Sequence, residues 1–365
     1  MSSAQYLDRL DRVRKGMADQ AIDVLLLSVG HDLPYLTGYY AMPLERLTML
    51  VVPRDGDATL VVPELEARRV VEQPDVFTIE PWPESADPVE IVARLCGEAS
   101  TLAVGDQMWA RFLVELLPHL PAASFRRAVD VIGPLRVVKD DAEVAALRAA
   151  GAAADRVAAQ LHAGEIVLVG RTEAQVSADI SARLLAEGHD KVNFAIVAAG
   201  ANAASPHHHA SGRVIEAGEI VLCDFGGTMD GYCSDITRCV FTGDPPAEIA
   251  EAYAVLHAAQ AAAVAAATVG TSCEDVDRAA RQIIADAGYG EYFIHRTGHG
   301  IGLEEHEDPY IIAGNTEPLA PGHAFSVEPG IYLGGRWGIR LEDIVVASDA
   351  GPQRLNNADH SLVTV

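Results

Sequence analysis

The chain has few of the features that mark a disulfide-stabilised, membrane-spanning or nucleic-acid-binding protein. Its five cysteines are an odd number and form no CxxC pair, which argues against a disulfide framework and for a reducing compartment. Only 27 Lys and Arg oppose 52 Asp and Glu, and a net charge of −25 disfavours binding to phosphate backbones. No uncharged apolar run approaches ~20 residues, and the charged N-terminus does not resemble a secretory signal. We therefore expect a cytoplasmic protein that binds neither nucleic acid nor membranes.

The 365 residues are enough for two domains, and 49% of them are hydrophobic. The stretch "VIGPLRVVKDD" breaks the pattern, and Gly133-Pro134 is expected to form a turn there. This predicts domains over residues 1–133 and 134–365. In the first, helices and strands alternate, which is typical of an α/β domain with a parallel or mixed sheet. The expected helices are 4–20, 64–72, 87–96 and 108–117, and the expected strands are 22–28, 47–53, 57–63, 76–80, 101–105 and 125–129.

The second domain shows an internal repeat, in which two helices followed by strands occur twice. "AGEIVLCDFGG" and "PGHAFSVEPGI" support it, because Gly218 leads to Asp224 as Gly322 leads to Glu328. A duplication would place these two carboxylates opposite each other across a pseudo-twofold axis. The expected helices are 140–162, 172–187, 246–268 and 273–287, with a capping box at Thr172 and an N-cap at Ser272. The expected strands are 192–198, 219–225, 232–241, 291–296, 323–328 and 338–347.

Four carboxylates lie in or at the ends of these apolar strands, namely Asp224, Asp235, Glu328 and Glu342. One acid near a strand end is most often solvated or salt-bridged. Four in two matched pairs repel one another, and the single Arg340 beside Glu342 cannot neutralise them. Two divalent cations would balance the charge.

The stretch "HRTGHGIGLEEHEDP" allows two interpretations, a glycine-rich anion-binding loop or part of a metal site. The four carboxylates would repel a phosphate and so favour the metal. His299 would add a nitrogen ligand, and such a hard site favours Mn²⁺, Fe²⁺, Co²⁺ or Zn²⁺. Two ions could bridge a water, activate it as a hydroxide nucleophile and polarise a carbonyl oxygen. We expect the alternating glycines to let the backbone pass close to the metals and the substrate.

Five motifs, "VLCDFGG", "GYCSDITR", "HRTGHGIGLEEHE", "SVEPGIY" and "GIRLEDIVV", occur in an order that resembles the dinuclear metallopeptidases of the pita-bread fold. The resemblance is to the Xaa-Pro dipeptidase (prolidase) and Xaa-Pro aminopeptidase branch. "LPYLTGYY" and "ERLTMLVVP" are similar to the creatinase-like N-terminal domain of that branch. The resemblance implies an α/β (α+β) chain with a C-terminal pita-bread domain. It also implies a homodimer that hydrolyses the peptide bond preceding proline.

The resemblance also implies roles for individual residues. Two ions per chain, Mn²⁺ foremost, would be held by Asp224, Asp235, His299, Glu328 and Glu342, with Asp235 and Glu342 bridging or chelating. His207 and His306 would relay protons or contact a substrate oxygen, Glu328 would also act as general acid or base, and His295 would line the pocket. Tyr232 and Arg340 would support the ligands and substrate, although Arg340 can also be read as an ordinary cross-strand ion pair. We expect no role for His208 and His209.

The resemblance leaves the substrate open at Tyr310. Prolidases have a basic residue at the matching position, which helps to hold the free carboxylate of a dipeptide. Tyr310 cannot supply that charge, so longer Xaa-Pro peptides become an alternative, unless Arg336 or a partner subunit supplies it. A non-peptide C–N hydrolase is a further alternative. A methionine aminopeptidase and a non-enzymatic scaffold are disfavoured by the N-terminal domain and the intact ligand set, respectively.

Overall fold

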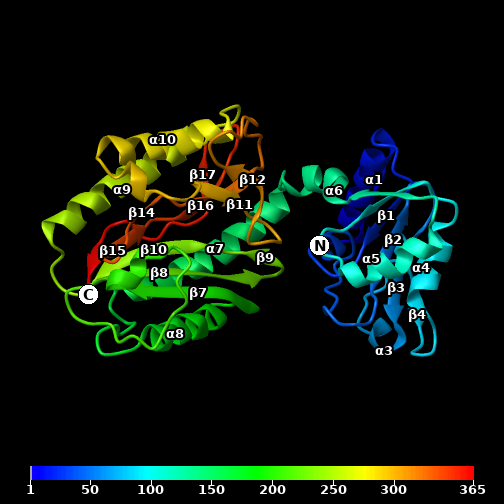
Figure 1. Ribbon diagram of the computed structural model, residues 1–365, viewed down its shortest axis with the longest axis horizontal. Coiled ribbons are helices and arrows are strands. Elements are labelled where there is room, and N and C mark those ends of the chain that lie inside the picture. Colours follow the sequence, from blue (N-terminus) through cyan, green and yellow to red (C-terminus); the bar gives the residue numbers. More distant parts are fainter. Residues whose placement is uncertain (1) are drawn as a thin grey trace. The chain divides into compact units, whose positions relative to one another are not determined.

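A computed structural model describes residues 2–365, which form two compact units, one ending at Arg136 and the other spanning Val137–Val365 (Figure 1). The N-terminal unit is built on one six-stranded sheet of order β4-β3-β2-β1-β5-β6. Its strands are β1 (Val24–Leu27), β2 (Met49–Pro53), β3 (Ala58–Pro63), β4 (Phe77–Trp82), β5 (Thr101–Val104) and β6 (Ser124–Arg127). The expected mixed sheet is confirmed, since β1, β2 and β3 pair antiparallel while β3-β4, β1-β5 and β5-β6 pair parallel.

The helices of this unit are α1 (Ser3–Asp19), α2 (Asp32–Thr37), α3 (Glu64–Ala67), α4 (Pro88–Cys96), α5 (Ala110–Leu116), the 3₁₀ turn η1 (Leu117–His119) and α6 (Val129–Arg136). Helix α1 buries Leu10, Val13 and Met17 on one face, as the spacing of its apolar residues predicts. Helix α2 was not expected. The prediction of a turn at Gly133-Pro134 was wrong, because both residues lie inside α6. Pro134 is the sixth residue of α6, beyond the first turn, and its ring nitrogen cannot donate the helical hydrogen bond to the Asp130 carbonyl.

The C-terminal unit contains the predicted repeat. Helices α7 (Asp141–His162) and α8 (Glu173–Ala186) precede β7 (Lys191–Ala199), η2 (Gly200–Ala204), β8 (Ile220–Met229), β9 (Tyr232–Cys233) and β10 (Ile236–Phe241). Helices α9 (Ala247–Ala266) and α10 (Cys273–Asp286) precede η3 (Gly290–Tyr292), β11 (Gly298–Gly300), β12 (Glu307–Ile311), β13 (Ala324–Val327), β14 (Gly330–Leu333), β15 (Trp337–Arg340) and β16 (Asp343–Val346). The short strands β17 (Gln353–Arg354) and β18 (Val363–Thr364) end the chain. Thr172 and Ser272 cap α8 and α10 as predicted.

The first sheet has the order β18-β10-β8-β7, with β9 also paired to β8, and its pairs are antiparallel except β10-β18, which is parallel. The second sheet has the order β12-β11-β13-β16-β17 and is antiparallel throughout. Figure 1 shows α9 and α10 on one side of these strands and α8 on the other, and α7 shares a core with α8. Val157, Ile180 and Phe225 belong to the core beneath the first helix pair, and Leu256, Ile284 and Phe325 to the core beneath the second. The two halves therefore bury their strands between two helix layers.

Helix α9 is long and apolar enough to cross a membrane by length and composition alone. It nevertheless packs against α10, and Ile249, Leu256 and Ala263 along it are buried in the core. A core helix passes the same test, so α9 is weak support for a membrane span.

Three local predictions were wrong. Residues 291–296 form the end of η3 and an irregular segment, because Phe293 and Arg281 fix this backbone through side-chain contacts and not through strand pairing. Asp224 lies in the middle of β8 and not at a strand end. Asp235 lies in a two-residue break between β9 and β10, where Ser234 bonds to Gly227 through both its backbone N–H and its side-chain Oγ.

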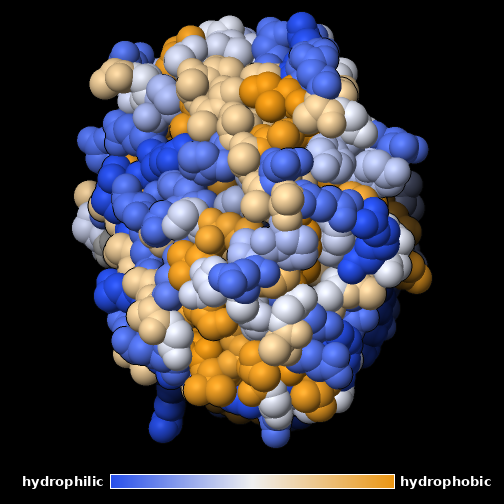
Figure 2. Space-filling model, turned by 90° about the vertical axis from the view of Figure 1, so that its left-hand side faces the viewer, coloured by the Kyte–Doolittle hydropathy of each residue, from blue (hydrophilic) through white to orange (hydrophobic). Residues whose placement is uncertain are grey.

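The surface is mixed in polarity. Figure 2 shows one face of the molecule, on which hydrophobic side chains form separate patches between hydrophilic ones. Large hydrophobic side chains exposed in the C-terminal unit include Val167, Val169, Val214, Ile294 and Ile312.

Candidate metal centre

The five expected ligands come from both halves of the C-terminal unit. Asp224 lies in β8 and Asp235 immediately before β10, in the first sheet. His299 is the middle residue of β11 and Glu328 directly follows β13, in the second. Glu342 lies between β15 and β16 and forms a backbone bridge to Thr237 of β10. The site is therefore placed where the two sheets meet.

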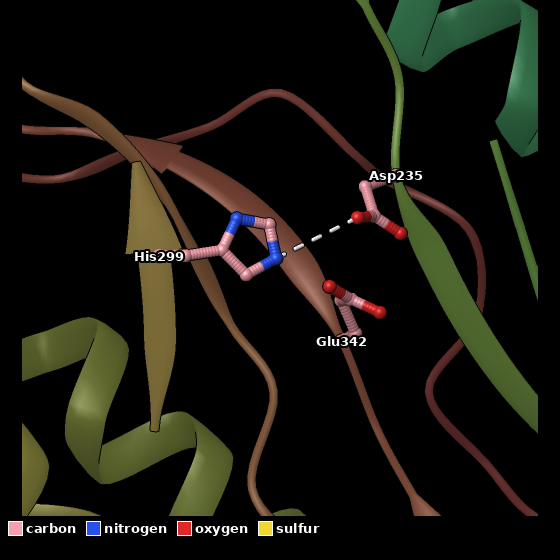
Figure 3. Close-up of side chains that lie close together, drawn as sticks. All are labelled: Asp235, His299 and Glu342. Carbon is pink, nitrogen blue, oxygen red and sulfur yellow. Dashed lines mark ion pairs between the residues drawn. The ribbon is translucent and has the colours of Figure 1, made fainter. Parts of the chain in front are cut away.

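Three of these residues already have the spacing of a metal site. One ligand atom each of Asp235, His299 and Glu342 lies within 4.8 Å of the others, and all three residues are buried. Figure 3 shows their side chains pointing toward one another from three separate segments of the chain. His299 Nε2 is 3.8 Å from Asp235 Oδ2 and 3.3 Å from Glu328 Oε1. One carbonyl fixes this ring, since His299 Nδ1 is 3.0 Å from the Gly300 oxygen and Nε2 is left facing the carboxylates.

The carboxylates are held under mutual repulsion. Burial, then the charges of Glu342 and Asp224, raises the pKa of Asp235 well above its ordinary value. Burial, then the charges of Glu328 and Asp224, does the same to the pKa of Glu342. Burial would also raise the pKa of Glu328, but its hydrogen bond to His299 and the nearby positive charge lower it to about 2. Bound cations reverse this repulsion.

A divalent ion fits the atoms that the protein leaves unsatisfied. Asp224 Oδ1 and Asp235 Oδ1 are buried and have no hydrogen-bond partner among residues 2–365. Buried carboxylate oxygens without partners are costly and uncommon. Four carboxylates and one imidazole are a donor set that hard and borderline divalent ions accept. The residues therefore fit a divalent metal centre.

Arg340 occupies the base of this centre. Its guanidinium is 2.5 Å from Asp224 Oδ2 and donates to Thr237 Oγ1 at 3.1 Å and to the Tyr332 hydroxyl at 2.9 Å. Thr237 in turn donates to Glu342 Oε2 at 2.6 Å. Arg340 was expected to orient Glu342. It instead contacts Asp224 directly and reaches Glu342 only through Thr237, whose hydroxyl no sequence motif had singled out.

The three histidines that were expected around the metals line the same cavity. His306 stacks edge-on against His299, with ring centroids 4.0 Å apart. Partial burial, together with the charges of His299 and Arg296, lowers the pKa of His306 to about 4. His295 Nε2 lies 2.8 Å from the Tyr332 hydroxyl, and burial lowers its pKa. Both rings are therefore neutral at physiological pH.

The structure does not bring the two expected tyrosines into the cavity wall. Tyr232 is buried, and its hydroxyl donates to Glu143 of α7 at 2.9 Å. Tyr310 lies outside the lining and packs its ring beneath the guanidinium of Arg296, 4.3 Å from the ring centroid. Arg336 bonds to Glu248 and does not line the cavity. Tyr332 and Arg296 lie within two of the quoted motifs but were given no role, and Arg281 lies in none of the motifs.

His208 was expected to have no role, which was wrong. Its Nε2 lies 2.8 Å from Glu173, the first residue of α8, whose side chain is fully buried. Glu173 also accepts from Ser211 Oγ at 2.6 Å and from the Ala199 amide at 2.9 Å. Burial alone would raise the pKa of Glu173, but these bonds lower it to about 2. The cluster anchors the loop that carries His207.

The cavity around the centre measures about 800 Å³, within the range of small-molecule sites. One part of its wall is charged and carries the ligands and histidines. The other part is apolar and is formed by Phe194, Ile196, Phe293, Ile294 and Ile312. Such a cavity suits a small substrate with a polar bond and apolar side chains.

The alternating glycines near His299 act differently from what was expected. A Cβ on Gly298 would lie 1.8 Å from the Ser326 carbonyl oxygen, and one on Gly300 would lie 2.2 Å from that of Asp308. These clashes are with the backbone of neighbouring segments. The glycines therefore allow β11 to lie close to β13 and β12, and this packing fixes His299.

Known proteins resemble the chain over its whole length. A model described as Metallopeptidase family M24 matches residues 145–349, and one described as Creatinase/Prolidase N-terminal domain matches residues 9–138. A probable dipeptidase PepE of Mycobacterium tuberculosis is 44% identical, with 99% of this chain and 96% of that protein covered. An Xaa-Pro dipeptidase of Lactobacillus helveticus is 36% identical, with 97% and 98% covered.

Solved structures of similar proteins have the same fold as this chain. Dipeptidase PepE from Mycobacterium ulcerans superposes with a TM-score of 0.93 at 46% identity, covering 100% of this chain and 99% of that one. A prolidase from Thermococcus sibiricus superposes with a TM-score of 0.93 at 36% identity and 99% coverage of both chains. The chain therefore belongs to metallopeptidase family M24, as a divalent-metal-dependent peptidase with a creatinase/prolidase N-terminal domain and a C-terminal pita-bread domain.

Proposed function

We propose that the protein is an Xaa-Pro dipeptidase, which hydrolyses the peptide bond preceding proline with two divalent ions, Mn²⁺ foremost. The observation that carries this is the convergence of five ligand-type side chains and three histidines on one cavity. Relatives named Xaa-Pro dipeptidase, similar over nearly the whole chain, support the substrate class.

The ions would be held by Asp224, Asp235, His299, Glu328 and Glu342. When bound, they supply a Lewis acid for the scissile carbonyl oxygen and lower the pKa of water at the site. Arg340 holds Asp224 in place, and Thr237 holds Glu342.

The protein's own groups then orient the substrate and move protons. His306, which lies against His299, would hydrogen-bond the substrate carbonyl, and His207, which lines the cavity, would contact a second polar atom of the substrate. Glu328 serves as general acid or base beside His299. His295, fixed by Tyr332, completes the wall. Phe293 and Ile312 offer an apolar surface that a proline ring fits.

A second candidate is an Xaa-Pro aminopeptidase that accepts longer peptides. Tyr310, which carries no charge, favours it, as does a cavity of about 800 Å³. We also propose a homodimer that works in the reducing cytoplasm. Five free, buried cysteines support the reducing compartment. The family resemblance supports the dimer, and sedimentation velocity would measure the oligomeric state.

The activity is tested by stripping the protein with a chelator, restoring Mn²⁺ or Co²⁺, and assaying Ala-Pro, Ala-Ala and Arg-Pro-Pro. We expect Ala-Pro to be cleaved only with metal and at least about 10-fold faster than Ala-Ala, since a site shaped for proline discriminates by this much or more. Faster cleavage of Arg-Pro-Pro than of Ala-Pro favours the aminopeptidase. Failure with every peptide in the presence of metal refutes both candidates and points to a non-peptide C–N bond.

A further inference from the structure

Three arginines line the cavity, and two of them are neutralised by carboxylates. Arg281 makes two bonds of 2.8 Å to Asp277, and Arg340 bonds to Asp224. The guanidinium of Arg296 contacts the Tyr310 ring and makes no hydrogen bond or ion pair with any residue between 2 and 365. Arg296 is therefore the cation in the cavity that remains open to an anion from outside the chain.

The chemistry of this group indicates which anion it would bind. A guanidinium presents donors in a planar fork that matches a carboxylate, and it stays charged at every physiological pH. Elsewhere the cavity wall is rich in carboxylates, including Asp235, Glu305 and Glu342, and would repel a second negative group. A substrate carboxylate therefore has one favourable place in the cavity.

Arg296 also lies near the two histidines of the metal centre. It stands three positions before His299 in the chain and lines the same cavity as His299 and His306, whose rings are in contact. Both histidines belong to the reacting end of the cavity. In a dipeptide, the scissile carbonyl and the free carboxylate belong to adjacent residues, so the two must be bound close together. A longer peptide has an amide at that point.

The ring of Tyr310 restricts the guanidinium of Arg296. Its ring lies against the guanidinium at 4.3 Å, a distance at which cation–π attraction is significant. The tyrosine therefore removes freedom from the long Arg296 side chain without neutralising it. Arg336, which sequence reasoning had offered for the same task, is exposed, paired with Glu248 and absent from the cavity wall.

We propose that Arg296 binds the free carboxylate of a dipeptide substrate and that Tyr310 positions it. This proposal rests on the proposed dipeptidase function. It assigns the preference of the enzyme for dipeptides over longer peptides to one residue. Tyr310 thus takes part in carboxylate recognition although it supplies no charge.

The test measures kcat and KM for Ala-Pro and for its amide, Ala-Pro-NH₂, in Mn²⁺-loaded wild-type protein, Arg296→Gln, Arg296→Lys and the matched control Arg336→Gln. In Arg296→Gln, the ratio of kcat/KM for Ala-Pro to that for Ala-Pro-NH₂ should fall about 10- to 100-fold, mainly through KM, because one charge-assisted contact is lost. Arg296→Lys should recover part of the ratio, and Arg336→Gln should keep the wild-type ratio. Tyr310→Ala should lower the ratio more than Tyr310→Phe, which keeps the ring.

The outcomes separate this proposal from the one on which it rests. Suppose that the wild type cleaves Ala-Pro and that Arg296→Gln changes kcat/KM by the same factor for both substrates, or for neither. The assignment of Arg296 is then wrong and the dipeptidase function stands. If the Mn²⁺-loaded wild type cleaves neither substrate, the dipeptidase function is wrong and this proposal is refuted with it. Circular dichroism spectra and melting temperatures of all variants show that each is folded.

Discussion

Arg340 lies 2.5 Å from one carboxylate oxygen of Asp224 and leaves the other oxygen without a hydrogen-bond partner among residues 2–365. The pairing compensates part of the charge of Asp224, and the remaining oxygen stays available to a metal ion. A ligand carboxylate needs such an outer partner to keep its orientation. The ion pair at the base of the cavity is thus part of the metal centre.

Arg340→Lys should therefore weaken metal binding. A lysine keeps the charge but cannot bond to Asp224, Thr237 and Tyr332 together, and loss of such outer contacts typically costs about 10- to 100-fold in affinity or activity. Isothermal titration calorimetry of the metal-free protein with Mn²⁺ measures the change in metal affinity. Arg336→Lys is the matched control, and equal affinities in the two variants would show that Arg340 is not needed for the centre.

Asp235→Asn should abolish activity while leaving the fold intact. The amide removes a ligand charge, so we expect a loss of at least about 100-fold in kcat and a drop below about two bound ions per chain by elemental analysis. Burial, together with repulsion from neighbouring carboxylates, raises the pKa of Asp235, so removal of its charge should not destabilise the metal-free protein at pH 7. The exposed Asp244→Asn is the control. Near-normal turnover in Asp235→Asn would contradict the ligand assignment.

Glu173→Gln should destabilise the C-terminal unit in a pH-dependent way. The pKa of Glu173 lies at about 2 in the fold against 4.5 ordinarily, so its charge stabilises the protein above pH 4.5 and this stabilisation is lost as the pH falls toward 2. We expect a cost of about 2–3 kcal/mol at pH 7. Urea unfolding of both proteins at pH 7 and pH 3 measures it. A gap that stays constant with pH, or one no larger than in the exposed Glu216→Gln, would contradict the prediction.

Gly298→Ala should cost about 2–4 kcal/mol of stability, because its Cβ would meet the Ser326 backbone at 1.8 Å. Gly334→Ala is the matched control, since nothing lies within 4 Å of the Cβ it would add. Thermal unfolding of the metal-free proteins compares the two without interference from metal binding. Similar melting temperatures would show that β11 can move away from β13 at little cost.

The order of helices and strands could be read from the sequence because hydrophobic periodicity and capping residues are local signals. Thr172 and Ser272 marked helix starts correctly, and the repeat of two helices and strands was visible without a structure. The break at Ser234 and Asp235 was not visible, since it depends on side-chain contacts of Ser234 with Gly227, which lies across the turn.

The ligand-type residues could be predicted because buried carboxylates are rare and five motifs carried them. The residues that hold these side chains in position could not be predicted. Tyr332, Thr237 and Glu173 are ordinary residues in the sequence and acquire their positions only when distant strands meet. Arg296 was missed for a related reason, because a free guanidinium can be recognised only after the partners of Arg281 and Arg340 are known.

The two sheets of the C-terminal unit would supply the proposed ligands jointly, with Asp224 and Asp235 from one and His299 and Glu328 from the other. Bound ions would therefore act as a cross-link between the two halves of the repeat. The free energy of metal binding then adds directly to the cohesion of these halves. By the same linkage, a change that moves the two sheets apart must weaken metal binding. The metal affinity therefore measures how tightly the two halves of the repeat are held together.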